Sequence, residues 1–94
     1  MGPNEITRLV REIAEPLAHA EGVRLLNITF ARQGPSHVLR LVIDRPDAPT
    51  SVADCEGVSR AVSAALDATD AIPHAYLLEV SSAGKDTPLW KKSA

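Results

Sequence analysis

The segment YLLEVSSAGKDTPL, residues 76–89, decides how the rest of the chain is interpreted. Its beginning, Tyr76 to Val80, is rich in aliphatic and β-favouring side chains and predicts a strand. The four residues that follow, Ser81 to Gly84, have the composition of a turn. After them comes a polar tail that holds Pro88, Leu89 and Trp90. The segment therefore closes a domain whose other elements lie upstream.

Two further strands are predicted upstream, in residues 23–31 and 38–44. Both alternate between apolar and other side chains, with one face formed by Leu26, Ile28 and Phe30 in the first and by Leu39, Leu41 and Ile43 in the second. Between them, residues 33–36 read Gln-Gly-Pro-Ser, which is turn composition. The two strands are therefore predicted to pair as a β-hairpin with one buried face.

Helical spacing of apolar residues predicts two helices. The first has Asn4 as its N-cap and ends near Gly22, with an inner face of Ile6, Leu9, Val10, Ile13 and Leu17. It includes Pro16, an interior proline that burial of this face is expected to outweigh. The second begins at Ser51, with Asp54 completing a capping box, and has an inner face of Val52, Cys55, Val58, Val62, Ala65 and Leu66.

The predicted order is α-β-β-α-β, which is an α+β fold in two layers. A three-stranded sheet would have both helices on one face, and the second helix would join two parallel strands by a crossover. The other face of the sheet would stay partly open. Arg40 is predicted to point toward this open face, and Glu79 is predicted to face solvent there.

Composition limits the classes of function. Ninety-four residues are enough for one domain, and a formal charge of −2 argues against a nucleic-acid binder driven by net positive charge. A local basic patch stays open, because Arg24, Arg32, Arg40 and Arg45 lie on or beside the hairpin. The single cysteine excludes an internal disulfide and favours a reducing compartment. With no signal peptide and no long apolar run, a cytoplasmic location and no membrane contact are predicted.

Residues that bind metals or react as thiols do not cluster in the sequence. His19, His37 and His74 lack the spacing of a helical metal pair, and one cysteine cannot build a structural zinc site. Cys55 lies on the apolar face of the second helix, where a buried and inert thiol is expected. The sequence therefore predicts no metal and no cofactor.

Two motifs near the end of the chain have partial likeness to catalytic signatures. Ser81-Ser82 follows a strand as a nucleophile elbow does, but no G-x-S-x-G surrounds it. Gly84-Lys85 is similar to the end of a phosphate-binding loop, but Glu79 stands where that loop needs a glycine. Both motifs fail on spacing, so the chain is predicted to act by binding and not as an enzyme.

Residues 76–84 resemble the ribosome maturation factor family RimP, whose pattern here is close to Y-x-L-E-V-S-S-P-G followed by L-D-R-P-L. Upstream, residues 38–44 resemble its v-L-R-v-y-I-D strand. Asp54-Cys55 with Val58-Ser59-Arg60 resembles its D-C-x-x-v-S-R helix start. The residues Leu66, Asp67, Asp70, Ile72 and Pro73 match L-D-x-x-d-x-I-P. The motifs occur in the family's order over residues 5–89.

The resemblance implies a non-catalytic assembly factor that binds the immature small (30S) ribosomal subunit late in its assembly. Implied partners are a ribosomal protein of the S-twelve family and small-subunit rRNA. The fold is expected to be related to the type II KH domain, although the chain lacks a G-x-x-G loop. The residues expected to contact the ribosome or a second domain are Arg40, Asp44, Arg60, Glu79, Ser81, Ser82, Gly84, Lys85, Pro88 and Leu89.

The family continues into a C-terminal SH3-like domain. Residues 1–89 are therefore expected to be the N-terminal domain, with residues 90–94 as a tail toward the second domain. Three positions depart from the family pattern, namely Ala83 for proline, Lys85 for leucine and Thr87 for arginine. These departures leave open a second hypothesis, a stand-alone protein-interaction module that dimerises through a sheet edge.

Overall fold

A computed structural model of the protein describes residues 2–47, 49–82 and 90–93. The elements are α1 (Pro3–Ala20), β1 (Arg24–Gln33), β2 (Ser36–Asp44), α2 (Val52–Thr69), β3 (Tyr76–Ser82) and β4 (Trp90–Ser93). The predicted order α-β-β-α-β is confirmed. The structure adds β4, which occupies most of the segment predicted to be a tail.

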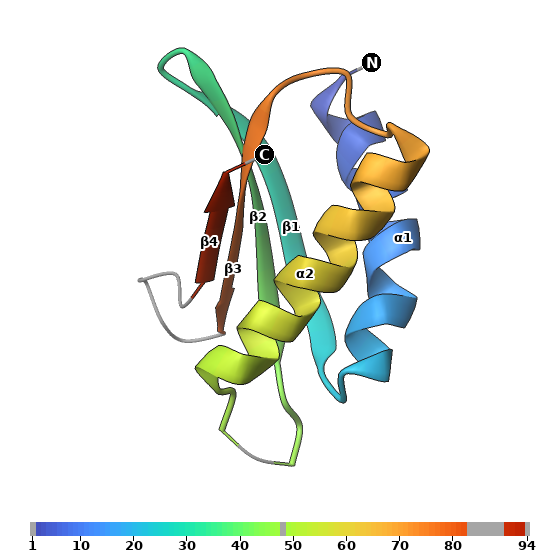
Figure 1. The fold of residues 1–94 in the computed structure, drawn as a ribbon, viewed down its shortest axis with the longest axis vertical. Coiled ribbons are helices and arrows are strands. Elements are labelled where there is room, and N and C mark those ends of the chain that lie inside the picture. The colour runs from blue at the N-terminus through green and yellow to red at the C-terminus, as the bar shows by residue number, and fades with distance from the viewer. Residues whose placement is uncertain (1, 48, 83–89, 94) are drawn as a thin grey trace.

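The strands form one mixed sheet in the order β1-β2-β3-β4. β1 and β2 are antiparallel, β2 and β3 are parallel, and β3 and β4 are antiparallel. The parallel pair is joined through α2, because parallel neighbours need a crossover connection. Both helices lie on one side of the sheet, α1 next to β1 and α2 against β3 and β4 (Figure 1). β2 and β3 are therefore the interior strands.

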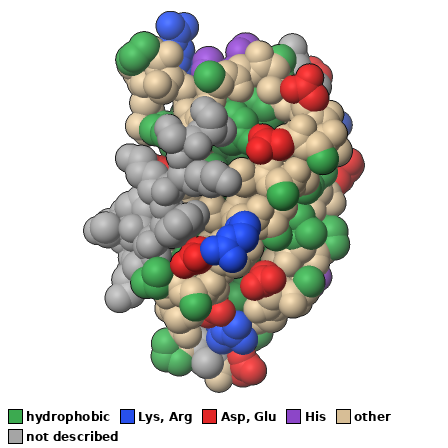
Figure 2. All heavy atoms as spheres, in the orientation of Figure 1, with side chains coloured by type: hydrophobic (Ala, Val, Ile, Leu, Met, Phe, Trp, Pro, Cys, Tyr) green, Lys and Arg blue, Asp and Glu red, His purple; other side chains and the backbone are tan. Residues whose placement is uncertain are grey.

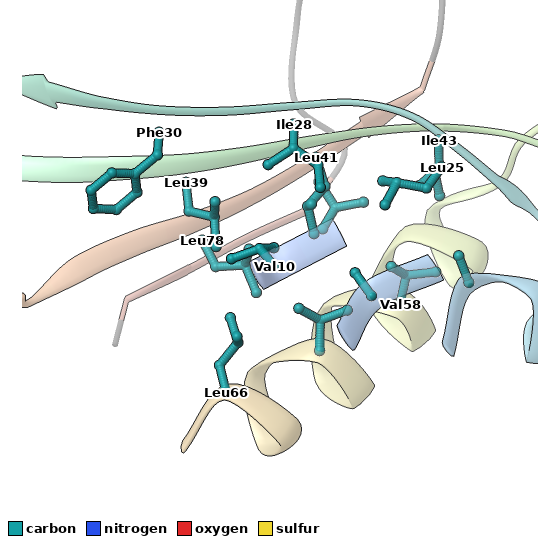
Figure 3. Packing of buried hydrophobic residues seen from close by; sticks show 14 of the residues in the cluster. Val10, Leu25, Ile28, Phe30, Leu39, Leu41, Ile43, Val58, Leu66 and Leu78 are labelled. Atoms are coloured by element: carbon teal, nitrogen blue, oxygen red, sulfur yellow. The ribbon is translucent and has the colours of Figure 1, made fainter. Parts of the chain in front are cut away.

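The hydrophobic core fills the space between the helices and the sheet (Figure 3). Leu39, Leu41 and Ile43 of β2 are completely buried, as the alternation of this strand predicts. Val10 from α1 and Val58 from α2 meet them from the helix side (Figure 3). Each such side chain contributes about 1.5–3 kcal/mol of hydrophobic free energy, which sets the face that β2 turns inward.

The start of α1 differs from its prediction. Gly2 is the N-cap, and no side chain among the described residues caps the helix. Pro3 opens it, so the assignment of Asn4 as the N-cap is wrong. Proline suits the first position because its ring presets φ and its missing N–H is not needed there. Pro16 lies inside α1 on an exposed position, and the helix continues to Ala20. At the far end Gly22 has φ +80°, as predicted for a left-handed position.

α2 begins as predicted. Ser51 accepts a hydrogen bond from the backbone N–H of Asp54, and the Asp54 carboxylate accepts one from the N–H of Ser51. The expected inner position of Val52 is wrong, because its side chain is more than half exposed at the first turn of the helix. Ser59 and Ser63 are buried instead, which apolar periodicity alone could not reveal.

β1 contains a bulge that alters its predicted alternation. The pairing with β2 shifts between Leu25 and Asn27, which leaves Leu26 without a paired position. Leu26 is 45% exposed, and Leu25 takes the buried place with Ile28 and Phe30. The extra residue reverses the side-chain alternation at this point, so the prediction of an inward Leu26 is wrong.

Candidate functional site

The site is built on the open face of the sheet, defined here as the face opposite the helices. Because paired positions in neighbouring strands share a face, the ladder places Arg40 of β2 beside Glu79 of β3. Thr29 of β1 is the partner of Arg40 on the other side, and position 91 of β4 is the partner of Glu79. A row of polar and charged positions therefore crosses the middle of the open face.

Arg40 and Glu79 form an ion pair within this row. Nε and Nη2 of Arg40 both donate to Oε2 of Glu79, at 3.0 and 2.8 Å. The Arg40 side chain is 44% exposed, and the Glu79 side chain only 7%. Glu79 does lie on the open face, but the prediction that it faces solvent is wrong. Glu79 lies on an interior strand, and its buried carboxylate is compensated by the hydrogen bonds that it accepts from the more exposed Arg40.

Ser81 and Ser82 belong to β3 and not to a turn. The parallel ladder runs on to the pairs Val42 with Ser81 and Ile43 with Ser82. The Ser81 side chain therefore lies on the same face of the sheet as Arg40 and Glu79, whereas the Ser82 side chain lies on the face that the helices cover. Both serines are buried. Backbone pairing with the interior strand β2 extends β3 beyond the point where side-chain composition indicated a turn.

Asp44 and Arg60 lie apart from the Arg40–Glu79 pair. Asp44 ends β2 and forms an ion pair with Arg24 of β1, its neighbour in the antiparallel ladder. Arg60 is strongly exposed on α2, where it pairs with Glu56 one turn earlier. The fold therefore gathers Arg40, Glu79 and Ser81, places Asp44 at the end of the same face, and leaves Arg60 in the helix layer.

The remaining predicted site residues, Gly84, Lys85, Pro88 and Leu89, lie outside the described residues. The same is true of Ala83 and Thr87, two of the three departures from the family pattern. Their expected roles stay predictions.

A second polar cluster lies at the β2–α2 connection. Arg45 donates through Nε to Asp54 Oδ2 at 3.1 Å and through Nη2 to Asp54 Oδ1 at 2.6 Å. Its Nη2 also donates to the Glu21 carbonyl at the end of α1. The hydrogen bonds from Arg45, followed by those from Ser51, hold the pKa of Asp54 well below its usual range. The capping box signalled Asp54, but nothing in the spacing indicated that Arg45 would be its partner.

Two histidines that are far apart in the sequence meet at the hairpin end of the sheet. The ring of His37 stacks on Phe30 with centroids 5.2 Å apart and on His74 at 4.6 Å. Within the described ranges, no three His, Cys, Asp or Glu side chains are placed to hold a metal ion together. What the structure shows for these histidines is ring stacking with each other and with Phe30.

Cys55 lies fully inside the core on α2. Burial, with a smaller contribution from the charge of Asp54, raises the pKa of its thiol to about 11. A thiol with so high a pKa is a poor nucleophile near neutrality, because the thiolate is the reactive form.

Neither described helix is long and apolar enough to cross a lipid bilayer.

The geometry defines a class of protein: a small two-layer α+β domain with charged pairs on the open face of a mixed sheet. Comparison with protein families sharpens this class, because residues 13–86 match the RimP N-terminal domain. The match runs from the middle of α1 past the end of β3 and covers most of the chain. The chain belongs to the RimP family, which is a family of ribosome maturation factors.

Proposed function

We propose that this domain binds the immature small ribosomal subunit and assists its late assembly by binding alone. The observation that carries the proposal is the RimP N-terminal domain match over residues 13–86. Support comes from the open face, where Arg40 stays half exposed although its carboxylate partner is buried. A surface side chain held in this way is suited to recognition, because less conformational freedom is lost when a partner binds.

The proposed contact surface starts from Arg40, Glu79 and Ser81 on the open face, with Asp44 at its end. Gly84, Lys85, Pro88 and Leu89 are proposed to extend it along the chain, and Arg60 would be a separate contact from α2. Ser82 is buried on the helix side and is left out of this surface. Its proposed partners are a ribosomal protein of the S-twelve family, small-subunit rRNA and the SH3-like C-terminal domain of a longer chain. The proposed place of action is the cytoplasm.

Co-sedimentation through a sucrose gradient tests the proposal. The purified chain is mixed at low salt with immature small subunits, mature small subunits or mature large subunits. We expect it to travel with the immature small subunit and to stay at the top of the gradient with the large subunit. Failure to travel with any small subunit at low salt would refute the proposal.

A second candidate function is a protein-interaction module that dimerises through a sheet edge. It is favoured by β1, which ends the described sheet and pairs on one side only, with β2. The bulge after Leu25 and the arginines Arg24 and Arg32 act against such pairing, because bulges and charges protect edge strands. Sedimentation equilibrium separates the two candidates: a concentration-dependent dimer supports the module, and a monomer at all concentrations contradicts it.

A further inference from the structure

Charge is divided between the two layers of the fold. The four strands carry five basic residues (Arg24, Arg32, Arg40, Lys91 and Lys92) and two acidic ones (Asp44 and Glu79). The two helices carry six acidic residues (Glu5, Glu12, Glu15, Asp54, Glu56 and Asp67) and three basic ones (Arg8, Arg11 and Arg60). Figure 2 shows Asp and Glu side chains spread over the side of the molecule that presents α2. The sheet is therefore the basic layer of a protein whose net charge is −2.

Both carboxylates of the strands are already paired with arginines. Asp44 pairs with Arg24, and Glu79 pairs with Arg40. Arg32 has no ion-pair partner within the described part of the chain, and its Nε donates to the Gly34 carbonyl. Paired carboxylates repel an approaching anion less than unpaired ones, because the neighbouring guanidinium offsets much of their field. Arg32 is paired with His37 and position 92 with Leu78, so both lie on the helix side of the sheet. The open face therefore carries Arg24, Arg40 and Lys91 against Asp44 and Glu79. With both carboxylates already paired, this face favours an anionic partner over a cationic one.

Arg40 keeps one edge of its guanidinium available. The edge formed by Nε and Nη2 is used by Glu79 Oε2. Within the described ranges Nη1 has no hydrogen-bond partner, and the second N–H of Nη2 points toward the same free edge. Two parallel donors on a planar group fit two oxygens of a phosphate. Because Arg40 is 44% exposed, that edge can be reached from solvent.

We propose that the free edge of Arg40 binds a backbone phosphate of small-subunit rRNA and that Glu79 is the positioning residue that holds the guanidinium for it. This inference rests on the proposed function, since it names the part of the immature subunit that the open face contacts. The charge of the open face favours an anionic partner, the half-exposed guanidinium gives that partner access, and the buried carboxylate fixes the orientation of the guanidinium. Small-subunit rRNA is the polyanion that the proposed function brings to this face.

The test measures dissociation constants for immature small subunits and for protein-free small-subunit rRNA over a series of salt concentrations. Arg40→Gln should weaken binding about tenfold at low salt and make the slope of log affinity against log salt shallower by about 0.7–0.9, the loss expected for one phosphate contact. Arg11→Gln is the matched control: this arginine is 43% exposed, also pairs with a glutamate, and lies in the acidic helix layer. It should leave affinity and slope unchanged.

Glu79→Gln tests whether the carboxylate positions Arg40. It should weaken binding at every salt concentration but leave the slope as in the wild type, because the phosphate contact itself remains. A second readout needs no binding partner. The ¹⁵N relaxation of Arg40 Nε in the free protein should show a rigid side chain in the wild type and a mobile one in Glu79→Gln. Thermal unfolding of each variant shows that it is folded.

The outcomes distinguish the inference from the function it rests on. If the wild type binds the subunit and Arg40→Gln binds with equal affinity and slope, the inference is wrong and the proposed function stands. Binding to the subunit with none to protein-free rRNA, together with an unchanged slope, would assign the open face to a protein partner. Mobile Arg40 Nε in the wild type would refute the role of Glu79. If the wild type does not bind the subunit at all, the proposed function itself fails.

Discussion

Arg45 and Asp54 form a bidentate ion pair, in which two guanidinium nitrogens of Arg45 each donate to a different carboxylate oxygen of Asp54. The pair joins three parts of the chain, because Arg45 also reaches the Glu21 carbonyl and Asp54 also caps α2 through Ser51. Since charged hydrogen bonds of this kind are worth more than neutral ones, the pair should be a main stabiliser of the β2–α2 connection.

Replacing Asp54 with asparagine should therefore lower stability in a pH-dependent way. Asp54→Asn is expected to reduce the free energy of unfolding by about 1–2 kcal/mol at pH 7. The pKa of Asp54 is lower in the folded protein than in the unfolded chain, so its carboxylate stabilises the fold above about pH 4. That contribution is lost as the pH falls toward the folded-state pKa. Urea denaturation from pH 7 to pH 2.5 should show the difference from wild type narrowing below pH 4.

The control for this prediction is Asp47→Asn. Asp47 is highly exposed, and its carboxylate is as far as 4.0 Å from Arg45 Nη1. Because so exposed and distant a pair is weak, removing the charge of Asp47 should change the free energy of unfolding by less than about 0.5 kcal/mol. A stability difference for Asp54→Asn that stays constant from pH 7 to pH 2.5 would contradict the ion-pair explanation.

The bulge in β1 predicts opposite outcomes for adjacent leucines. Leu25→Ala should cost about 2–4 kcal/mol, because Leu25 is only 8% exposed and its removal leaves a cavity. Leu26→Ala should cost less than about 1 kcal/mol, because Leu26 is 45% exposed. Chemical denaturation of the two variants measures both values. Equal costs, or a larger cost at Leu26, would mean that the strand alternates without a bulge.

Ser59 offers a stabilising substitution. Its Oγ is buried and has no hydrogen-bond partner among the residues that the structure describes. Ser59→Ala should raise the free energy of unfolding by about 0.5–1 kcal/mol, because it removes an unsatisfied hydroxyl and alanine favours the helix more than serine does. The midpoint of thermal unfolding should rise accordingly. A fall in the midpoint would show that the hydroxyl makes a bond in solution.

Cys55 should react with thiol reagents only when the domain opens. Its thiol is inside the core, and burial raises its pKa to about 11, so little thiolate exists at pH 8. Ellman's reagent should label the folded protein slowly and the denatured protein at once. The raised pKa also means that stability is complete below the unfolded-state pKa of about 8.5 and falls as the pH rises above it. Rapid labelling under native conditions would contradict this placement.

Much of the fold could be predicted because local patterns and tertiary packing agree. β2 alternates cleanly, and its Leu39, Leu41 and Ile43 are all completely buried. The capping box at Ser51 is a local signal that needs no partner elsewhere in the chain. The bulge at Leu26 was missed because a strand with one extra residue has the same composition as one without it.

The candidate site was harder to predict, because its chemistry depends on pairing between distant segments. Sequence placed Arg40 and Glu79 on the same face, but not in adjacent strands, since the strand order could not be read from alternation. Without the strand order, the sequence does not show which residue lies beside Glu79, so exposure to solvent is the simplest prediction for its side chain. Likewise, the sequence does not distinguish Arg45 from the other three arginines near the hairpin. Only the folded β2–α2 connection shows that Arg45 is the partner of Asp54.

The parallel pairing of β2 with β3 has a consequence for the time course of folding. β1 and β2 are joined by a two-residue turn at Gly34 and Pro35, so their hairpin closes locally. Arg40 and Glu79 are 39 positions apart, so they can meet only after the residues of α2 and β3 have been synthesised. During synthesis the hairpin should therefore precede the ion pair. The anion-binding edge of Arg40 would become oriented only in a chain that has completed its sheet.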